Sequence, residues 1–534
     1  MLGKIDNQDS IFSSKFLFEK LIPESSIYKA LHVYGPQFLQ DEDFKESYCL
    51  DNGRKSVPPS VLCGAMLLQH HDKVSDDEAV QRVIFDIRWK YALHLPSEYT
   101  GFARTNLVNF RIRLLEGGHG RVVFDKLNEL AIKLGLLNPE DTQIVDSSNI
   151  IGRAAVQDTY ELLRTAIKKL IVKIRKRGKK QFTDIVKELR LEKYVIQEGK
   201  ADIDWQDPGQ REKILQELVT DGRRLLEGLS VENASQDEVI SRASDLLCQI
   251  LGQDITSPEE ESEKGISPQI KQGVAKDRII STNDTEMRHG RKSSSKKFNG
   301  YKVHITEDRD HEWITNVEVT AGNVHDAEPS LELVKVQEET LGTKPERLLG
   351  DGAYGTADNR ADFDAEGIEL ISRITTSHDG KVHKEHFDID LKNGCVTCIA
   401  GHVTEKYTKG KDGKGREVRT FVFAAEKCLN CKFHEKCTSS KSGRKVTLNF
   451  NEQYLQEARK KQRLAWFDKE YSTRAIIERK LSHLMYNFGL RQARYMGIIK
   501  TKLQALFTAA VANLKRLNVE MHFTPPKGVV CLNG

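Results

Sequence analysis

Three acidic residues lie where carboxylates could hold metal ions. Asp146 ends a predicted strand over 142–146, Asp351 ends another over 347–351, and Glu478 falls in a helical pattern near the C-terminal end. Mg²⁺ prefers a few carboxylates together with water and phosphate oxygens. Two such ions can activate an attacking oxygen and stabilise a leaving one in phosphoryl transfer. The chain has 78 acidic residues, so the presence of these three carboxylates does not by itself identify a site. The elements that surround them must also be considered.

The sequence around Glu478 favours a helix with one functional face. Tyr471, Arg474 and Glu478 are spaced at i, i+3 and i+7, which places them within about 60° of arc on a helix. A surface salt bridge between Arg474 and Glu478, four residues apart, is a simpler interpretation of the same pattern.

The order of the predicted elements indicates how the three acids could meet. After the strand ending at Asp146 and a long helical insertion come two adjacent strands, a helix, a strand, a helix, a strand, an inserted module and a helical zone. Without the insertions this is the order of a ribonuclease-H-like fold, whose first and fourth strands are neighbours and whose last helix crosses near their ends. We therefore expect an α/β fold with such a mixed-sheet core. The expected boundaries are 1–139 for an all-α N-terminal domain, 140–155, 276–375 and 450–520 for the core, 156–275 for the charged helical insertion, 376–449 for a cysteine-rich module and 521–534 for a tail.

The cysteine-rich module holds five of the nine cysteines. Since the sequence has no export signal, such a cluster favours a metal over disulfides. Four thiolates make a closed tetrahedral zinc site, so one of the five is surplus, and a set of reduced, unliganded thiols is the alternative. The candidates are Cys395, Cys398, Cys428, Cys431 and Cys437, with His402 and His434 as alternate ligands.

Charge and composition favour a nucleic-acid-binding protein without a membrane span. The net charge is only +4, but residues 168–180 and 288–297 are basic runs without an acid. Basic patches on an otherwise mixed surface are typical of nucleic-acid binders, although a solvated lysine-rich helix face also explains either run. The uncharged stretch 503–514 is too short and too polar to cross a bilayer, and the N-terminus has no apolar segment typical of a secretory signal.

The pattern Tyr471, Arg474, Glu478 resembles the Y-(2)-R-(3)-E-(6)-K signature of DDE transposases from bacterial insertion sequences. The similarity covers about residues 15–518, and the N-terminal segment resembles the helical N-terminal domain of the same group. Other segments that carry it are 53–59, 109–113, 144–148, 298–304, 319–326, 350–355 and 489–495.

The resemblance implies an enzyme that binds terminal inverted repeats, cleaves a phosphodiester to free a 3′-OH, and uses that 3′-OH to attack target DNA. Asp146, Asp351 and Glu478 would hold two Mg²⁺ or Mn²⁺ ions, while Tyr471 and Arg474 would contact the backbone near the cleaved end. A homodimer is expected because two ends must be paired, and the expected location is the bacterial cytoplasm, at the nucleoid. The basic runs would add affinity that falls with salt, through Arg175, Lys176, Arg177, Arg288, Arg291 and Lys292.

The resemblance also selects among the cysteines. The family pattern of a Cys followed by a small residue and Gly matches the segment 398–401. This favours a structural zinc site made by Cys398, Cys428, Cys431 and Cys437, with Cys395 as an alternate.

Two other acids have simpler expected roles, and one basic residue of the signature is absent. Asp326 precedes a predicted helix and is expected to be its N-cap, and Asp284 is expected to be a loop acid. The final basic residue of the signature would fall at Met485, and Lys480 lies about 200° round the helix from Glu478. The alternatives are a catalytically inactive or domesticated DNA-binding protein, against which the three intact acids argue, and a host nuclease on the same fold.

Overall fold

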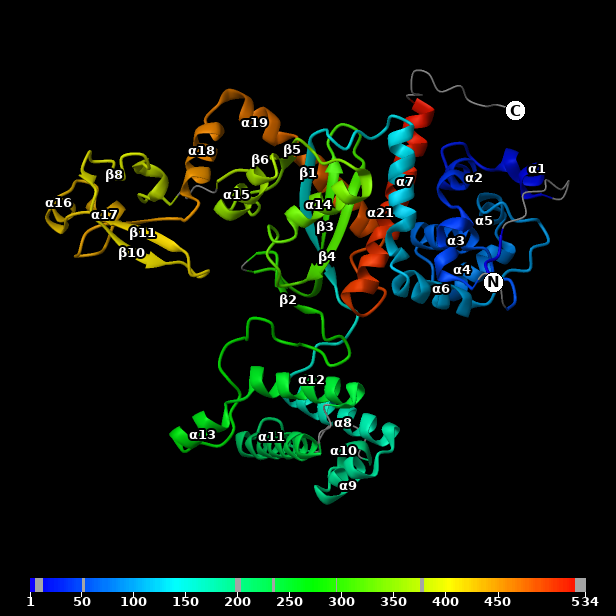
Figure 1. The fold of residues 1–534 in the computed structure, drawn as a ribbon, viewed down its shortest axis with the longest axis horizontal. Helices are drawn as coiled ribbons and strands as arrows, with labels where there is room; N and C mark the ends of the chain where they lie inside the picture. The colour runs from blue at the N-terminus through cyan, green and yellow to red at the C-terminus, as the bar shows by residue number, and fades with distance from the viewer. Residues whose placement is uncertain are drawn as a thin grey trace.

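A mixed sheet forms the centre of the molecule, with three other parts around it. The computed structural model describes residues 1–4, 13–49, 53–196, 203–232, 236–293, 295–374 and 379–523. In Figure 1 the N-terminal helices lie to the right of the sheet, the cysteine-rich module to the left and the helical insertion below. None of the helices in these described ranges is long and apolar enough to cross a membrane.

The central sheet has the strand order of a ribonuclease-H-like fold, as expected from the sequence. Its order is β4-β3-β1-β5-β6, with β2 paired to β3 as well. β3 is antiparallel to β1, β2 and β4, whereas β5 runs parallel to both β1 and β6. The strands are β1 Gln143–Ile151, β2 Arg288–Arg291, β3 Lys297–Asp308, β4 Ile314–Ala321, β5 Arg347–Leu349 and β6 Glu369–Ile371.

The two faces of the sheet are covered by different helices. Successive side chains of a strand point to opposite faces, and β1 follows this rule: Val145 packs in a cluster with residues of α14 and α15, whereas Ile144 belongs to a larger cluster with residues of α20 and α21. Asp146, two residues beyond Ile144, therefore lies on the α20 side. The helices of the core are α14 Ser330–Leu341, α15 Ala357–Ala365, α18 Glu452–Gln462, α19 Ala465–Ser472, α20 Ala475–Ser482, the π-helix η6 His483–Asn487 and α21 Ile498–Phe523.

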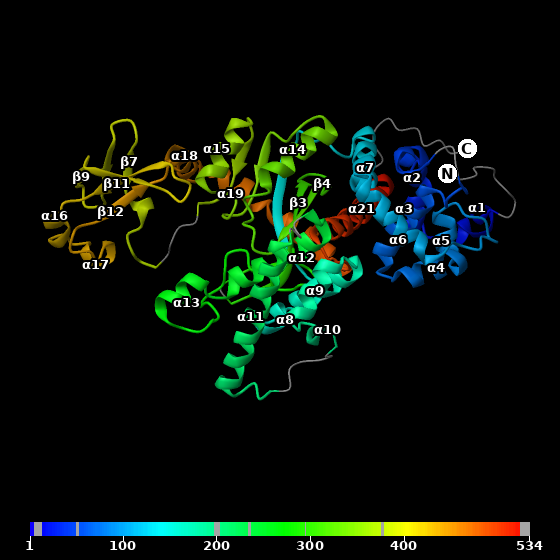
Figure 2. The same cartoon turned by 60° about the horizontal axis from the view of Figure 1, so that its bottom comes forward.

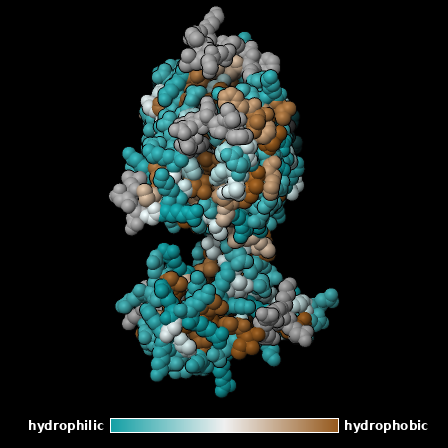
Figure 3. All heavy atoms as spheres, turned by 90° about the vertical axis from the view of Figure 1, so that its right-hand side faces the viewer, coloured by the Kyte–Doolittle hydropathy of each residue, from teal (hydrophilic) through white to brown (hydrophobic). Residues whose placement is uncertain are grey.

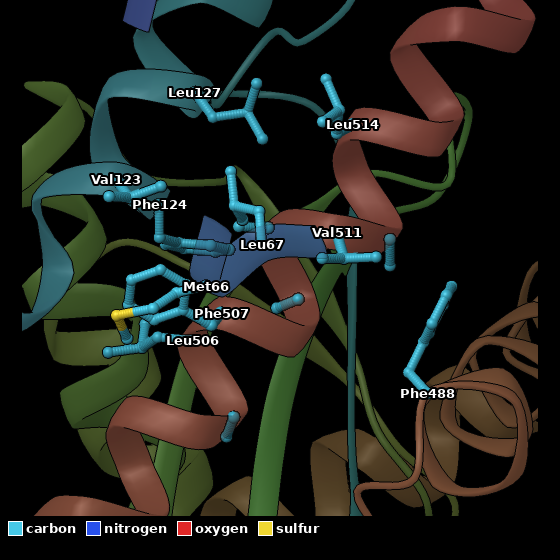
Figure 4. Close-up of a cluster of buried hydrophobic side chains, with 14 of the residues drawn as sticks. Met66, Leu67, Val123, Phe124, Leu127, Phe488, Leu506, Phe507, Val511 and Leu514 are labelled. Carbon is cyan, nitrogen blue, oxygen red and sulfur yellow. The ribbon is translucent and has the colours of Figure 1, made fainter. Parts of the chain in front are cut away.

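The long helix α21 joins the sheet to the N-terminal helices. It contacts β4 on one side and α3 and α7 on the other. Figure 4 shows Leu506, Phe507 and Val511 of α21 lying among side chains of those two helices. The N-terminal helices thus share one hydrophobic cluster with the sheet. They are α1 Ser14–Phe18, α2 Ile27–Phe38, α3 Pro59–Asp72, α4 Asp76–Phe85, α5 Ile87–Ala92, α6 Arg104–Glu116 and α7 Val122–Lys133.

The insertion between β1 and β2 has a hydrophobic cluster of its own. Leu163, Ile167 and Leu170 of α8 pack there against Leu225 of α11 and Leu247 of α12. Figure 3 shows this part as a body joined to the rest by a narrow waist, and Figure 2 shows α11 projecting from it. Its helices are α8 Thr159–Arg177, α9 Lys180–Glu188, α10 Lys193–Ile196, α11 Pro208–Val231, α12 Glu238–Asp254 and α13 Pro258–Lys264.

The cysteine-rich module consists of two three-stranded sheets and two short helices. The sheets have the orders β7-β8-β9 and β10-β11-β12. Asp358 of α15 fastens the module to the core through ion pairs with Lys414 and Arg416 at 2.7 and 2.9 Å. The elements are β7 Asp388–Asp390, β8 Cys395–Thr397, β9 Val403–Thr404, β10 Tyr407–Lys411, β11 Glu417–Val422, α16 Ala425–Leu429, α17 His434–Cys437 and β12 Lys445–Leu448.

Candidate active site

Asp146 and Asp351 lie at one edge of the sheet, on neighbouring parallel strands. β1 pairs with β5 through Ile144 and Leu349. Continuing this parallel register by two residues sets Asp146 opposite Asp351. The expectation that each acid ends its strand was wrong: β1 continues to Ile151 because it stays paired with the long β3, and β5 ends two residues before Asp351.

Glu478 approaches this edge from α20. The helix contacts β1, and its Ile477 and Leu481 are buried in the core while the Glu478 side chain is 59% exposed. Two expectations about this helix were wrong. It is not the last one, since α21 follows it, and Tyr471 lies on a separate helix, α19. Tight turns, in which the amides of Thr473 and Arg474 bond to carbonyls three residues back, separate α19 from α20.

Arg474 connects two of the three acids. Its guanidinium donates to Glu478 at 2.7 Å and lies 3.4 Å from Asp146 Oδ2. The pair with Glu478 is the i, i+4 salt bridge expected from the sequence, but the contact with Asp146 makes it part of the acidic cluster. The arginine therefore supplies positive charge between a strand and a helix.

Asp351 and Glu478 both act on the pKa of Asp146. Burial is the main cause that raises the pKa of Asp146 to about 6, and the negative charges of Asp351 and Glu478 raise it further. The Ser147 amide, which donates to Asp146 Oδ1 at 2.7 Å, and the charge of Arg474 act in the opposite direction. Mutual repulsion of this kind marks a place where a cation would be stabilised.

The donor set fits a hard divalent cation, although the side chains are not converged on one. Three carboxylates within electrostatic reach are the ligands that Mg²⁺ prefers, and Arg474 partly neutralises them. Among the residues that the structure describes, no three His, Cys, Asp or Glu side chains are grouped closely enough to form a metal site. A cation there would draw Asp146, Asp351 and Glu478 together and compete with Arg474.

A glycine and a tyrosine shape the turn that carries Asp351. Tyr354 folds back over Gly350, whose Cβ, if present, would lie 2.9 Å from that tyrosine side chain. The Tyr354 hydroxyl is buried. Burial and then the charges of Asp146, Asp326 and Asp351 raise its pKa well above the usual range. Tyr354 therefore forms the inner wall of the acidic cluster.

Asp326 is one of the acids whose charge acts on Tyr354. The expectation that Asp326 is an N-cap was wrong. The helix α14 begins at Ser330 with Pro329 as its N-cap. Asp326 instead accepts a hydrogen bond from Lys302 Nζ at 2.8 Å. Burial alone would raise the pKa of Asp326, but the bond and charge of Lys302 hold it below its usual value.

Asp284 lies in the loop before β2, as expected, but it has a structural role there. It is buried, and its carboxylate accepts hydrogen bonds from the Tyr301 hydroxyl and from the amide of Gly497. Asp284 thereby connects the segment before β2 with β3 and with the start of α21.

Packing explains the positions of Tyr471 and of the two residues considered for the final basic residue of the signature, Met485 and Lys480. Tyr471 stacks on Phe467 with ring centroids 5.7 Å apart, and Arg373 lies over its ring. Met485 is buried in the core on the π-helix η6. Lys480 also faces inward, where it lies 3.4 Å from Glu307 and donates to the Glu312 carbonyl. Neither position 480 nor position 485 can therefore present a cation beside Glu478.

The two basic runs have different surroundings. At the end of α8, Arg175 pairs with Glu192 and Arg177 with Asp237, and Lys176 is exposed. In the second run, Arg288 donates to backbone carbonyls. Arg291 and Lys292 are exposed on the hairpin between β2 and β3. Neither run lies at the acidic cluster.

Four of the five clustered cysteines surround one small pocket. Cys398, Cys428, Cys431 and Cys437 line it together with phenylalanines and with the alternates His402 and His434. The other three thiols influence the pKa of Cys437, which burial raises first of all. The amides of Phe433 and Arg444 point at the sulfurs of Cys431 and Cys428 at 3.5 Å. Cys395 lies outside this group, near Asp388, Asp390 and Glu405.

Two segments of the chain match known families. Residues 397–518 match the family described as transposase DDE domain, and residues 16–113 match the transposase domain DUF772. The chain is similar to DDE transposases of insertion sequences. This confirms the resemblance inferred from the motifs, and with it the ribonuclease-H-like fold. No curated protein matches the chain.

Only part of the candidate site lies within the ranges that match the families. The DDE match contains Glu478, Arg474 and the four pocket cysteines, whereas Asp146 and Asp351 lie before it. For these two acids the parallel register of β1 and β5 is the supporting observation.

Sequence reasoning missed the polar face of β3. Lys302, His304 and Thr306 alternate with the apolar Tyr301, Val303 and Ile305. His304 pairs with Ser147 of β1, so these polar side chains lie on the face opposite to Asp146. His304 is buried, and burial lowers its pKa to about 4. Polar residues at every second position of a strand are the signal that could have found this face.

Proposed function

We propose that the protein is an insertion-sequence transposase that binds terminal inverted repeats and catalyses metal-dependent cleavage and transfer of DNA strands. The observation that carries the proposal is the parallel register of β1 and β5, which when continued by two residues sets Asp146 opposite Asp351, together with Arg474, which donates to both Asp146 and Glu478. The family matches support the same chemistry.

The three carboxylates would hold two Mg²⁺ or Mn²⁺ ions. Bound there, these ions would supply charge stabilisation for the attacking and leaving oxygens of an in-line displacement. Cleavage adds water at phosphorus and releases a 3′-OH, and in transfer that 3′-OH attacks a phosphodiester of target DNA. Asp146 is held on β1 and Asp351 on the turn directly after β5, whereas the Glu478 side chain on α20 is 59% exposed and would have most freedom to adjust.

Arg474, Tyr471 and the basic runs have separate tasks in this proposal. Arg474 balances Asp146 and Glu478 before the ions bind and then turns to the phosphate backbone near the cleaved end. Tyr471, supported by Phe467, contacts the same part of the backbone. The basic runs add salt-sensitive affinity. Two copies pair the two ends, and the protein works in the bacterial cytoplasm at the nucleoid.

A structural zinc ion in the cysteine-rich module is part of the proposal. The four pocket cysteines are the ligands, and backbone amides already point at the sulfurs of Cys428 and Cys431. Donors of this kind orient and stabilise metal-bound sulfur. The zinc would hold α16 and α17 against β8.

The test is strand cleavage by Glu478→Gln. The amide keeps the size and polarity of the side chain but removes the charge that, with the two aspartates, balances the metal ions. We expect wild-type protein to cut end DNA with Mg²⁺ and not with EDTA. Glu478→Gln should cut nothing while its affinity for end DNA stays within about threefold. Glu457→Gln, an exposed acid on α18, is the matched control.

The same measurement separates the alternatives. Cleavage at the wild-type rate by Glu478→Gln would exclude this residue as a ligand. Wild-type protein that binds ends without cutting them would favour the inactive, DNA-binding alternative. Cutting without joining to target DNA would favour a nuclease.

A further inference from the structure

A basic pocket lies beside the strand that carries Asp146. It has a volume of about 520 Å³ and is formed by the C-terminal half of β1, the β2–β3 hairpin and Arg491. Its lining contains Lys292, Lys296, Lys297 and Arg491 and no acidic residue. Among the described residues, no acid forms an ion pair with these four cations. The pocket is therefore a concentrated positive charge that the protein does not neutralise itself.

The pocket is built on the same rigid element as the acidic cluster. The amide of Ile151 donates to the Arg491 carbonyl, and the amide of Ala493 donates to the Ile151 carbonyl, both at 2.9 Å. Arg491 also donates to the Oδ1 of Asn149 at 2.6 Å, and that asparagine is buried. The segment after η6 thus extends the sheet at the end of β1 and holds Arg491 in place.

The hairpin is held close to β1 by a glycine. Gly300 of β3 has φ +147°, and a Cβ there would lie 2.2 Å from the Ile150 carbonyl oxygen. Only glycine allows this approach of the two backbones. The pocket therefore keeps a defined position relative to Asp146, even though its lysines are exposed.

The composition of the lining fits a sugar–phosphate backbone. Lysine and arginine contact phosphate oxygens without reading bases. Ile151 and Val156, which are 39% and 44% exposed, add apolar surface for deoxyribose. A small free anion would need only the cations, whereas an apolar strip between them suits a chain of sugars and phosphates.

We propose that this pocket binds the phosphate backbone of duplex DNA at a fixed distance from the cleaved phosphate. The pocket residues Asn149 and Ile151 lie three and five positions beyond Asp146 on β1, which is about 10–17 Å along a strand. At about 3.4 Å per base pair, the bound phosphates lie about three to five base pairs from the site of cleavage. The inference rests on the proposed function for its point of reference.

The first test is the salt dependence of DNA binding. We expect the triple variant Lys292→Ala, Lys296→Ala, Lys297→Ala to bind a labelled 30-bp duplex at least tenfold more weakly at low salt. Its slope of log affinity against log salt should flatten by up to about 0.9 per lost phosphate contact. The control removes three exposed cations of α11 by Arg211→Ala, Lys213→Ala, Arg224→Ala and should change the affinity less than threefold. Equal effects of the two triple variants would overturn the proposal.

The second test measures position. End DNA carrying one neutral methylphosphonate at successive positions should lose affinity for the wild-type protein most strongly about three to five base pairs from the cleaved phosphate. The pocket variant should show no such maximum, because the contact is already lost. An identical profile in both proteins would overturn the proposal even if both cut DNA. Failure of the wild type to cut would instead refute the proposed function. In that case the methylphosphonate positions would be numbered from the repeat terminus, and the comparison of the two affinity profiles would still decide whether the pocket binds DNA.

Discussion

The guanidinium of Arg474 lies 3.4 Å from the carboxylate of Asp146, although the two residues are 328 positions apart in the sequence. Asp146 is on a central strand, and Arg474 is the N-cap residue of α20. The same guanidinium binds Glu478. A positive side chain thus occupies the space in which a divalent cation would find its ligands, so arginine and metal compete for the same charge.

This competition predicts an unusual effect of Arg474→Ala. At pH 8, above the pKa of about 6 of Asp146, loss of the arginine should tighten Mn²⁺ binding to the DNA-free protein by about tenfold, because repulsion between the two cations disappears. Cleavage should nevertheless fall, since the variant loses its contact to the backbone. Mn²⁺ titration by electron paramagnetic resonance measures the affinity. Arg479→Ala, which removes an exposed cation paired with Glu312, is the control, and weaker Mn²⁺ binding by Arg474→Ala would contradict the prediction.

The cysteine-rich module should bind zinc at one equivalent per chain. Cys428→Ser should lose the metal because it removes one of four ligands around the small pocket. Cys395→Ser should keep it, because that thiol lies away from the pocket. Elemental analysis of protein purified without chelators distinguishes the variants. Wild-type protein without zinc, or equal zinc in both variants, would refute this assignment.

Much of the core could be predicted from the sequence because strand order depends on local patterns. Apolar runs broken by polar turns locate β1, β3, β4, β5 and β6, and once β1 and β5 are neighbours, Asp146 and Asp351 must share an edge. The spacing of Tyr471, Arg474 and Glu478 identified the right segment. It could not show where a helix is interrupted, because the turns at Thr473 use the same backbone conformation as a helix and leave no mark in the spacing.

The residues that sequence reasoning misjudged are those whose role depends on distant partners. Asp326 looks like an N-cap in its local sequence, but Lys302 on another strand decides its role. Asp284 is buried only because Tyr301 and Gly497 converge on it. Met485 would share the face of Glu478 on a regular helix, but the π-helix changes the register and buries it. Such contacts form only when segments distant in the sequence pack together, so the neighbouring residues in the sequence do not reveal them.

A buried acid beneath α20 should make stability depend on pH. Glu307 on β3 is fully buried, and burial is the main cause that raises its pKa to about 7. Lys480 and Arg479 lower this pKa and Glu312 raises it. Because the folded pKa exceeds the unfolded value near 4.5, the folded protein holds the proton more tightly. Its stability therefore declines as the pH rises from about 4.5 to about 7.

Glu307→Gln removes this titration. Between pH 5 and pH 8 we expect the variant to gain about 2 to 3 kcal/mol in free energy of unfolding relative to the wild type. Urea denaturation at the two pH values measures the difference. Glu346→Gln, an exposed acid in the same part of the chain, should show none. A difference that stays constant with pH would mean that Glu307 does not titrate in this range.

The basic run at the end of α8 is expected to contribute less to DNA affinity than its charge suggests. Neutralising Arg175, Lys176 and Arg177 should weaken binding and flatten its salt dependence by up to about 0.9 per lost phosphate contact. Arg175 and Arg177 already pair with Glu192 and Asp237 at 3.5 and 3.1 Å. The exposed Arg175–Glu192 pair is worth little, whereas Asp237, the partner of Arg177, is buried. DNA would have to displace both pairs and leave two acids near its phosphates.

We therefore expect the slope to change by about one or two contacts rather than three. Cleavage at saturating DNA should survive, because α8 belongs to the insertion and not to the sheet edge that holds Asp146. Affinity against salt and single-turnover cleavage with Mg²⁺, measured on the same triple variant, test both statements. Restoring Lys176 alone should recover most of the lost slope, because it is exposed at the end of the helix. An unchanged slope in the triple variant would show that this run is a solvated helix face, and loss of cleavage at saturating DNA would place the insertion in the catalytic step.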